Sequence, residues 1–553
     1  MHLCASYIWR TSVPRFRIAL CCALLISSRV TSQPSATARR DSVPLFSNLG
    51  TLHHEVTATP VAQRYFDQGL RLMYAFNHEE AINSFREGLR IDPKCAMCHW
   101  GIAMALGPNI NASMDSAFEK QAFDEATAAE ALSSGLPDSE RAYIAAAKRR
   151  YSASAGGNRA GLDSAYATAM REIVNRYPSD PDAAALFAES MLDLSPWDNW
   201  TPAGEPKPGT QEIVSTLERG IAFAPNHPGL CHFYIHTVEA SLTPERALPC
   251  AERLGALMPG AGHLVHMPAH IYLRVGRYAD ATMANEHAAH TDEIFLADRQ
   301  AQGAYPFYYA HNLDFLRAAT MMEGRSAQAI KAAQDLVAKI PAQMALASPS
   351  LQVFTIAYLG ALARFGKWNE ILAQPAPAPG LLYGRPVWHY ARGLALAGTG
   401  RFAEAAAESD SVAAAAAALP ADFLLGFHSG KSLLGIAHHT LLGEIALRQG
   451  HAARAVPHLE EAVKLQDALR YDEPTPWYYP VRQSLGAALL AAGRAGEAER
   501  VFTEDLRRNP NNGWSLYGLA ASLKAQGRDD ADARRKFVAA WARSDVKLSS
   551  SRF

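Results

Sequence analysis

The sequence predicts an all-α fold of about ten stacked helical hairpins, that is, an α-solenoid. Turn signals of the form Gly-x-aromatic-x-x-Ala, or close variants of it, recur at residues 276–281, 400–405 and 493–498. Each lies between two amphipathic stretches of helical period, as a tight turn between paired helices requires. No alternating pattern of the kind that strands show competes with this interpretation.

Length and composition favour a large folded repeat array. The chain has 553 residues, 49% of them hydrophobic, with 53 basic and 54 acidic side chains. This composition excludes a disordered protein, and a repeat array reaches such a length by stacking one unit rather than by adding globular domains. Because the net charge is only −1, nothing indicates a nucleic-acid partner, and we expect none.

The N-terminus has the order of a secretory signal peptide. Arg15 and Arg17 precede an apolar run over 18–26, and small residues suitable for cleavage follow at 30–32. We therefore expect a signal peptide over 1–32, a linker over 33–60, and a periplasmic or secreted protein; a buried N-terminal helix is the alternative. No later stretch reaches 18 apolar residues, so no membrane span is expected.

Small and bulky residues recur in a fixed register. Gly69, Ala81, Phe85 and Pro93 have the same spacing as Gly486, Ala498, Phe502 and Pro510. This pattern resembles the tetratricopeptide repeat (TPR), a 34-residue helix-turn-helix unit, and the resemblance implies a TPR α-solenoid. In this register the units lie near 62–95, 96 onward, 228–261, 262–295, 310–343, 352–385, 386–419, 436–469, 479–512 and 513–546.

The expected organisation has two arrays. An N-terminal array over 61–374 and a C-terminal array over 386–546 are separated by a Pro- and Gly-rich connector over 375–385 and followed by a tail over 547–553. The polar end of the chain, 534–553, is consistent with a solvent-facing terminal helix. Segments such as 77–81, 107–111, 266–272 and 511–516 are also similar to poorly characterised exported bacterial TPR proteins. That resemblance implies the fold and brings no established chemistry.

Histidines concentrate in one part of the chain. Nine of the twenty fall between residues 227 and 311, where an even spread would give about three. In TPR proteins a fixed set of first-helix positions lines the concave groove, and the resemblance places these residues there: His232, His236, Glu239, His263, His266, His270 and His311. Residues at i and i+4 share one helix face, which pairs His232 with His236 and His266 with His270.

Such a set suits a transition metal. Neutral imidazole binds zinc, iron and copper, and two histidines one helical turn apart are a common pair of ligands. The sequence therefore predicts a metal site in the groove, built mainly from His232, His236, Glu239, His266 and His270. The alternative is a set of polar groove residues that bond to each other or to a peptide. His227, His287 and His290 are not expected to be ligands.

The cysteines raise a second cofactor question. Cys95, Cys98 and His99 match the C-x-x-C-H string to which c-type haem is attached, while buried thiols or a Cys95–Cys98 disulfide are the alternatives. Cys231 and Cys250 lie on the two helices of one predicted repeat and could pair in an oxidising compartment.

Two hypotheses about function follow. In the first, the protein is an exported TPR scaffold that binds a peptide, a protein or a small molecule in its groove and carries a metal site there. In the second, the same histidines and Glu239 form a metalloenzyme with hydrolytic or oxidative activity. No common hydrolase, nucleotide-binding or zinc-protease motif is present. Aromatic connectors at 197–200 and 473–479 are expected to pack between repeats; capping of the groove and binding of a partner are the alternatives.

Overall fold

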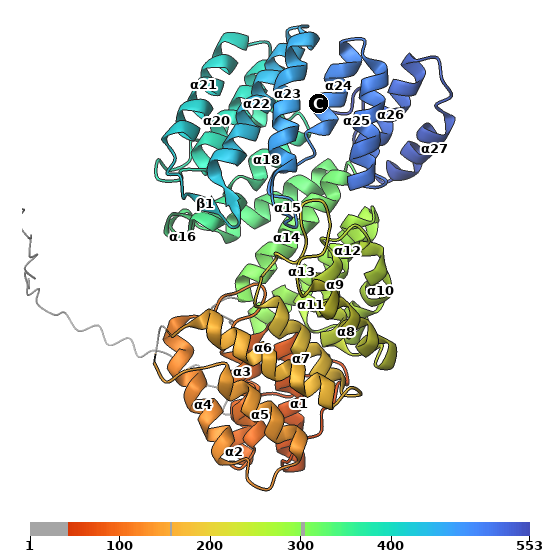
Figure 1. The fold of residues 1–553 in the computed structure, drawn as a ribbon. Helices are drawn as coiled ribbons and strands as arrows, with labels where there is room; N and C mark the ends of the chain where they lie inside the picture. The colour runs from red at the N-terminus through yellow and green to blue at the C-terminus, as the bar shows by residue number, and fades with distance from the viewer. Residues whose placement is uncertain (1–42, 155–156, 300–304) are drawn as a thin grey trace, which may run out of the picture. The chain divides into compact units, whose positions relative to one another are not determined.

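The structure, a computed structural model, describes residues 43–154, 157–299 and 305–553. The predicted signal peptide and the first part of the predicted linker lie outside these residues. Residues 44–553 form one unit, which consists of helices in chain order (Figure 1). The prediction of an all-α fold is confirmed, since the described residues contain a single small sheet of two two-residue strands.

The first half of the unit begins with a helix-free segment, residues 44–59, that packs against α1. The α-helices of this half are α1 (Pro60–Tyr74), α2 (His78–Ile91), α3 (Ala96–Ala105), α4 (Glu119–Ala131), α5 (Asp138–Arg149), α6 (Arg159–Arg176), α7 (Pro181–Leu192), α8 (Thr210–Phe223), α9 (Pro228–Val238), α10 (Leu248–Leu257), α11 (Gly262–His266), α12 (Pro268–Arg274), α13 (Tyr278–Arg299) and α14 (Tyr305–Met322). Two 3₁₀ turns, η1 (Ser116–Phe118) and η2 (Pro244–Ala247), connect them.

The second half continues with shorter helices and one small hairpin. Its helices are α15 (Ser326–Lys339), α16 (Ala342–Ala347), η3 (Pro349–Leu351), α17 (Gln352–Thr355), α18 (Ala357–Arg364), α19 (Trp368–Leu372), α20 (Gly384–Gly398), α21 (Phe402–Ala418), α22 (Gly430–Arg448), α23 (Ala452–Asp467), α24 (Arg482–Ala491), α25 (Ala495–Arg508), α26 (Gly513–Ala525) and α27 (Ala531–Ala540). The strands β1 (Leu424–Leu425) and β2 (His428–Ser429) pair antiparallel.

Consecutive helices pack in pairs, and first helices of neighbouring pairs also touch, as α1 touches α3 and α24 touches α26. Glycines make this approach possible. A Cβ on Gly69 of α1 or on Gly101 of α3 would lie 2.5 Å from the ring of Phe85, which α2 inserts between them. Phe502 of α25 has the same place between glycines of α24 and α26. Small residues facing one large ring thus set the spacing of three successive helices.

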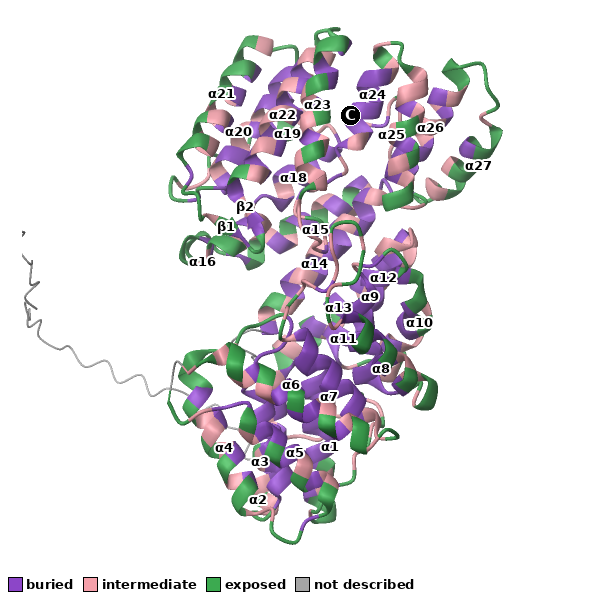
Figure 2. Ribbon diagram, viewed as in Figure 1, coloured by how far each residue is buried: buried purple, intermediate pink, exposed green. Residues whose placement is uncertain are grey.

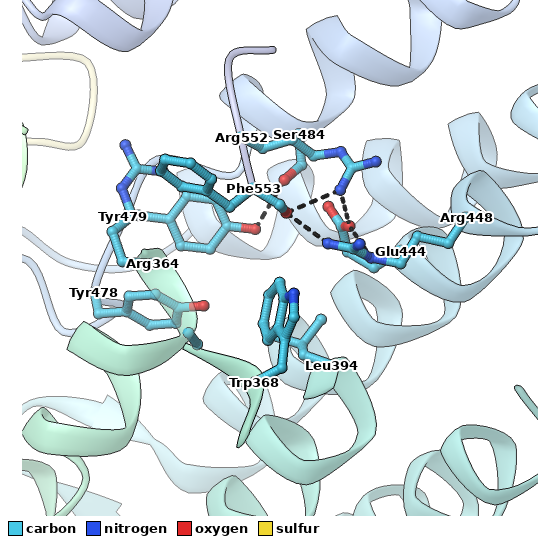
Figure 3. Close-up of a pocket in the computed structure, with 11 residues that line it drawn as sticks. Arg364, Trp368, Leu394, Glu444, Arg448, Tyr478, Tyr479, Ser484, Arg552 and Phe553 are labelled. Atoms are coloured by element: carbon cyan, nitrogen blue, oxygen red, sulfur yellow. Dashed lines mark hydrogen bonds and ion pairs between the residues drawn. The ribbon is translucent and has the colours of Figure 1, made fainter. Parts of the chain in front are cut away.

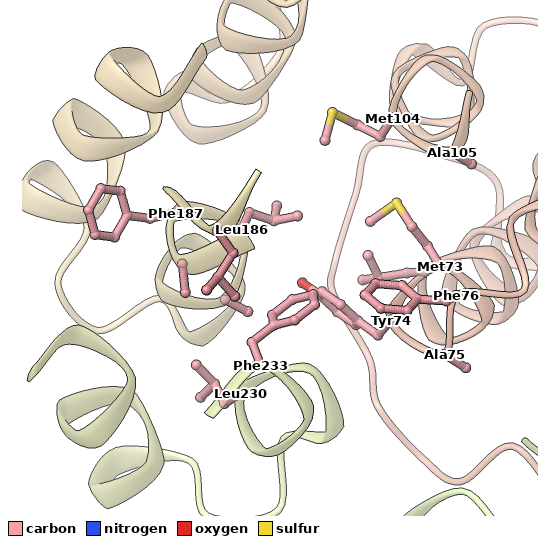
Figure 4. Close-up of a cluster of buried hydrophobic side chains, with 14 of the residues drawn as sticks. Met73, Tyr74, Ala75, Phe76, Met104, Ala105, Leu186, Phe187, Leu230 and Phe233 are labelled. Carbon is pink, nitrogen blue, oxygen red and sulfur yellow. The ribbon is translucent and has the colours of Figure 1, made fainter. Parts of the chain in front are cut away.

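Helix α9 lies at the centre of the first half. All of its residues are buried, as the purple ribbon in Figure 2 shows, and its sequence is apolar except for the residues described below. Leu230 and Phe233 of α9 join Tyr74 of α1, Phe76 in the turn after α1 and Leu186 of α7 in one apolar cluster (Figure 4). This core holds α9 against α7 and against α1, which lies more than 150 residues earlier in the chain. It fixes the position of the side chains that α9 presents on its other side.

The C-terminal segment differs from the prediction of a solvent-facing tail. Ser551 is buried and donates a hydrogen bond to the backbone carbonyl of Gln483 at 2.7 Å. Phe553 and Arg552 line a pocket with Trp368 and Glu444, where Arg552 Nη1 lies 2.6 Å from Glu444 Oε2 (Figure 3). The tail packs because α18, α22 and α24 offer aromatic and charged partners to it.

Two other features bear on the predicted organisation. A helix-free segment separates α19 from α20, where the sequence places its connector over 375–385; the division into two arrays stays a prediction. No helix among the described residues is both long and apolar enough to cross a membrane.

Candidate metal centre

Six histidines and two glutamates meet in the interior of the unit. Helix α9 supplies two histidines and ends at Glu239, α11 and α12 supply three more histidines, α14 supplies one, and the segment between α23 and α24 supplies Glu473. We call this set the histidine cluster: His232, His236, Glu239, His263, His266, His270, His311 and Glu473. The structure therefore brings together all seven residues that the sequence predicts as metal ligands, and it adds Glu473.

A proline shapes the part of the cluster between α11 and α12. Pro268 has no backbone N–H, so α11 ends at His266 and a new helix begins at Pro268. The backbone N–H of His270 bonds to the carbonyl of Met267 at 3.2 Å, which continues the turn. His266 and His270 consequently stay on one face, with their ring centroids 4.8 Å apart.

The ring nitrogens form two groups rather than one. His232, His236 and His263 make up the first triad, and His266, His270 and His311 make up the second; within each triad the ligand atoms lie within 4.8 Å of one another. The sequence-based expectation of one site from His232, His236, His266 and His270 stays a prediction, and in the structure these residues are divided between two adjacent triads. The reason is that His263 approaches the α9 pair, whereas α14 brings His311 to the α11–α12 pair.

Four of the six rings have the same orientation, with Nδ1 facing an oxygen atom. His232 Nδ1 donates to the carbonyl of Tyr74 at 2.7 Å, and His236 Nδ1 donates to Glu239 Oε1 at 3.0 Å. His266 Nδ1 donates to Asn285 Oδ1 at 2.7 Å, while Asn285 Nδ2 is engaged by the carbonyl of Ala281. His270 Nδ1 lies 2.5 Å from Glu239 Oε2 and 3.2 Å from Glu473 Oε2.

With hydrogen on Nδ1, the Nε2 atoms of His232 and His266 carry lone pairs, and each faces the Nε2 atom of a neighbouring ring. His266 Nε2 and His270 Nε2 are 2.9 Å apart, and His232 Nε2 and His263 Nε2 are 3.1 Å apart. At these distances one nitrogen of each pair carries a hydrogen that it donates to the other, or a metal ion takes the place of that hydrogen. Two nitrogens bound tetrahedrally to one zinc ion at about 2.0–2.1 Å lie about 3.3–3.4 Å apart, so a bound ion would need a shift of only a few tenths of an ångström.

Burial sets the protonation of the cluster. It lowers the pKa of His232, His263 and His266 well below the usual value, and neighbouring imidazoles lower it further. Burial and then His270 lower the pKa of His311 to about 3. These rings are neutral at pH 7, which is the form that binds a metal.

The two carboxylates act on His270 in particular. Burial alone would lower the pKa of His270, but Glu239 and Glu473 outweigh it and raise the pKa to about 9. Burial raises the pKa of Glu473, while His270 and His236 outweigh burial at Glu239 and lower its pKa to about 2. In the described part of the chain these carboxylates form ion pairs with histidines rather than with Arg or Lys.

The cluster is enclosed, unlike the open groove that the sequence predicts. The exposed fractions of His232, His266 and His270 are 0%, and that of Glu239 is also 0%. Aromatic rings cover it from several elements: Phe76 lies 4.5 Å from His232, Trp197 lies 5.1 Å from His236, and Phe315 lies 4.5 Å from both His266 and His270, each measured between ring centroids.

The two aromatic connectors singled out in the sequence close this cover. Arg470, just before the second connector, donates to the backbone carbonyls of Pro196 and Trp197 in the first. Glu473, at the start of the second connector, pairs with His270 of the cluster. Arg274 of α12 donates to the backbone carbonyl of Glu239 at 2.8 Å. Side chains and backbone from both halves of the unit therefore bury every histidine of the cluster except His311, which is half-buried.

The haem-like string has a different environment. Cys95 and Cys98 are bonded to each other in a disulfide at the start of α3, so neither thiol is free for a thioether bond. His99 Nδ1 lies 2.6 Å from Glu125 Oε2. Cys231 and Cys250 form a second disulfide, which joins α9 to α10 beside His232.

Three partners of the cluster were missed by the sequence analysis. Glu473 is 203 positions from His270, and the only signal was its place in an aromatic connector. Asn285 lies on α13, and Tyr74 contributes a backbone carbonyl, which no side-chain pattern reveals. His287 and His290 are exposed and lie outside the cluster, as expected.

A second buried network supports Tyr74. Asp182 of α7 accepts hydrogen bonds from Tyr74 Oη at 2.7 Å and from His227 Nε2 at 3.0 Å, and its other oxygen lies 2.7 Å from His54 Nδ1. Burial would lower the pKa of His54, but Asp182 outweighs it and raises the pKa to about 9. This network ties the N-terminal segment, α1, α7 and α9 together behind the first triad.

Comparison with known families gives a match in the second half of the unit. A family model described as the tetratricopeptide repeat matches residues 386–410 and 436–461, which fall on α20–α21 and α22–α23. Both segments are tetratricopeptide repeats. These repeats lie outside the histidine cluster, so the match supports the repeat architecture and assigns no role to the histidines. No curated protein sequence matches the chain.

Comparison with solved structures returns TPR proteins at low similarity. The human IFIT1 dimer with m7Gppp-AAAA is 13% identical, with 89% of this chain and 91% of that chain covered and a TM-score of 0.32. The APC/C hetero-tetramer Cut9–Hcn1 is 13% identical, with coverages of 88% and 74% and a TM-score of 0.30. The P58(IPK) TPR domain is 10% identical, with coverages of 84% and 98% and a TM-score of 0.20. Scores this low carry no argument about function.

The Asp182 network predicts a pH dependence of stability. Because the pKa of His54 rises from 6.5 to about 9 on folding, its stabilising effect is complete below pH 6.5 and is lost as the pH rises through about 9. In chemical denaturation between these limits, the free energy of unfolding should fall faster in the wild type than in His54→Gln, by up to about 1.4 kcal/mol per pH unit. Asp182→Asn should flatten the dependence equally. An unchanged slope in His54→Gln would contradict the assignment.

Proposed function

We propose that the protein is a TPR-type repeat scaffold that holds two transition-metal ions in its interior, one in each histidine triad. The observation that carries the proposal is the shared ring orientation. Nδ1 of His232, His236 and His266 bonds to oxygen and Nδ1 of His270 pairs with Glu239, while Nε2 of His232, His266 and His270 faces another imidazole. Metal-binding histidines commonly donate their other ring nitrogen to a carbonyl or carboxylate in this way. The ligand set suits zinc, iron or copper.

Orphaned polar atoms support the same proposal. Within the described residues, His236 Nε2 and His263 Nδ1 are buried without a hydrogen-bond partner. Leaving such groups unpaired in an apolar interior is costly, about 1–3 kcal/mol each. A metal ion in the first triad would give His236 Nε2 a partner, and neutral imidazoles at pH 7 would bind it without first releasing a proton.

Export of the protein belongs to this proposal as well. The signal-like N-terminus and two intramolecular disulfides favour a periplasmic or secreted protein, because disulfides persist in oxidising compartments. A peptide, protein or small-molecule partner and the absence of a nucleic-acid partner stay predictions, as does enzymatic activity.

The direct test is metal content. Protein purified without a His tag and titrated with Zn²⁺ or Cu²⁺ should bind two ions per chain, measured by elemental analysis after desalting. His232→Gln and His266→Gln should each bind one ion, because each removes a ligand from a different triad, and His232→Gln/His266→Gln should bind none. Failure of the wild type to bind any of zinc, copper or iron at neutral pH would overturn the proposal. Circular dichroism on the same samples reports whether each variant is folded.

The orienting role of Asn285 has its own test. Asn285→Leu removes the oxygen that holds Nδ1 of His266, and the affinity of the second triad should fall by about 10–100-fold. Asn285→Asp retains an acceptor at this position and should preserve the affinity. Competition titration with a chromophoric chelator measures both values. Equal affinities for Asn285→Leu and the wild type would show that His266 is not a ligand.

A further inference from the structure

The two triads differ in their exposure to solvent. All three histidines of the first triad are buried, with exposed fractions of 0% for His232, 4% for His236 and 1% for His263. In the second triad, His266 and His270 are equally buried, but His311 is only half-buried. His311 is therefore the one cluster histidine that solvent can reach.

His311 also differs from the other two histidines of the second triad in its hydrogen bonds. His266 and His270 have their Nδ1 atoms held by Asn285 and by the two glutamates, whereas His311 makes no hydrogen bond to another described residue. Its ring is placed by packing, with centroids 4.9 Å from His266 and 4.8 Å from Phe315. A ring that is held only by packing can shift to admit a neighbour.

A side chain of the same helix, α14, covers the first triad. Tyr308, one turn before His311 on α14, packs its ring 4.6 Å from that of His263. Of the two half-buried side chains on this face of α14, Tyr308 thus closes the first triad, while His311 is itself a member of the second.

We infer that the second triad, His266, His270 and His311, is the ligand-accepting metal site, and that it binds a small donor of two or three heavy atoms that enters past His311. This inference rests on the proposed function. Three protein ligands leave a position open on a tetrahedral ion. The rings of Phe315, His266 and His270 lie within 5 Å of one another and restrict the space at that position. The ligand class is that of azide, cyanide, nitric oxide and dioxygen.

Azide is the probe for this site. Cu²⁺-loaded wild type should show a saturable azide-to-metal charge-transfer band at one azide per chain. His232→Gln, which keeps the second triad, should retain the band, and His266→Gln, which keeps only the first triad, should lose it. A band in His266→Gln together with none in His232→Gln would assign the open position to the first triad and overturn the inference.

A series of ligands of increasing size, added to the wild type, tests the inference even if a variant does not fold. Azide and cyanide should bind, while 4-phenylimidazole should bind at least 100-fold more weakly because its phenyl ring cannot pass between His311 and Phe315. Equal binding of the bulky ligand, or no response to azide in protein that holds two copper ions, would overturn the inference and leave the proposed function intact. Absence of bound copper would instead overturn the proposed function.

Discussion

Six imidazole rings share one interior, and oxygen atoms from four different elements engage the Nδ1 atoms of four of them. The carbonyl of Tyr74, the amide of Asn285 and the carboxylates of Glu239 and Glu473 do this for four of the rings. An unpaired polar group in such a site would destabilise the fold, so these bonds decide which way each ring points. The facing Nε2 atoms, and hence the two triads, are a consequence of that orientation.

The repeat architecture holds the helices that carry these side chains close together and in fixed positions. Glycines that face Phe85 and Phe502 bring successive helices close together, and the same principle lets α9 lie against α1 and α7. The cover over the cluster comes from further along the chain, through Arg470 and Glu473. Because ligands and cover come from distant parts of the sequence, binding of a metal would stabilise contacts between the two halves of the unit.

The sequence was informative where the chemistry is local. Helical period and the Gly–Ala–Phe–Pro register predicted the hairpins, and the i, i+4 spacing predicted the pairs His232–His236 and His266–His270. It could not divide the ligands into two triads, since that depends on how α14 packs on α11. Nor could it reveal the backbone carbonyl of Tyr74 or the approach of Glu473. The expectation of an open groove was wrong because the connectors at 197–200 and 473–479, with Arg470 just before the second, cover the histidines.

The central claim is that the facing Nε2 atoms hold metal ions rather than protons. Crystals of the metal-loaded protein, measured above and below the absorption edge of the bound metal, test this most directly. The account predicts two anomalous peaks, one bonded to Nε2 of His232 and His236, the other bonded to Nε2 of His266 and His270. Absence of a peak at either position, with the metal bound only at surface histidines such as His287 or His290, would contradict it.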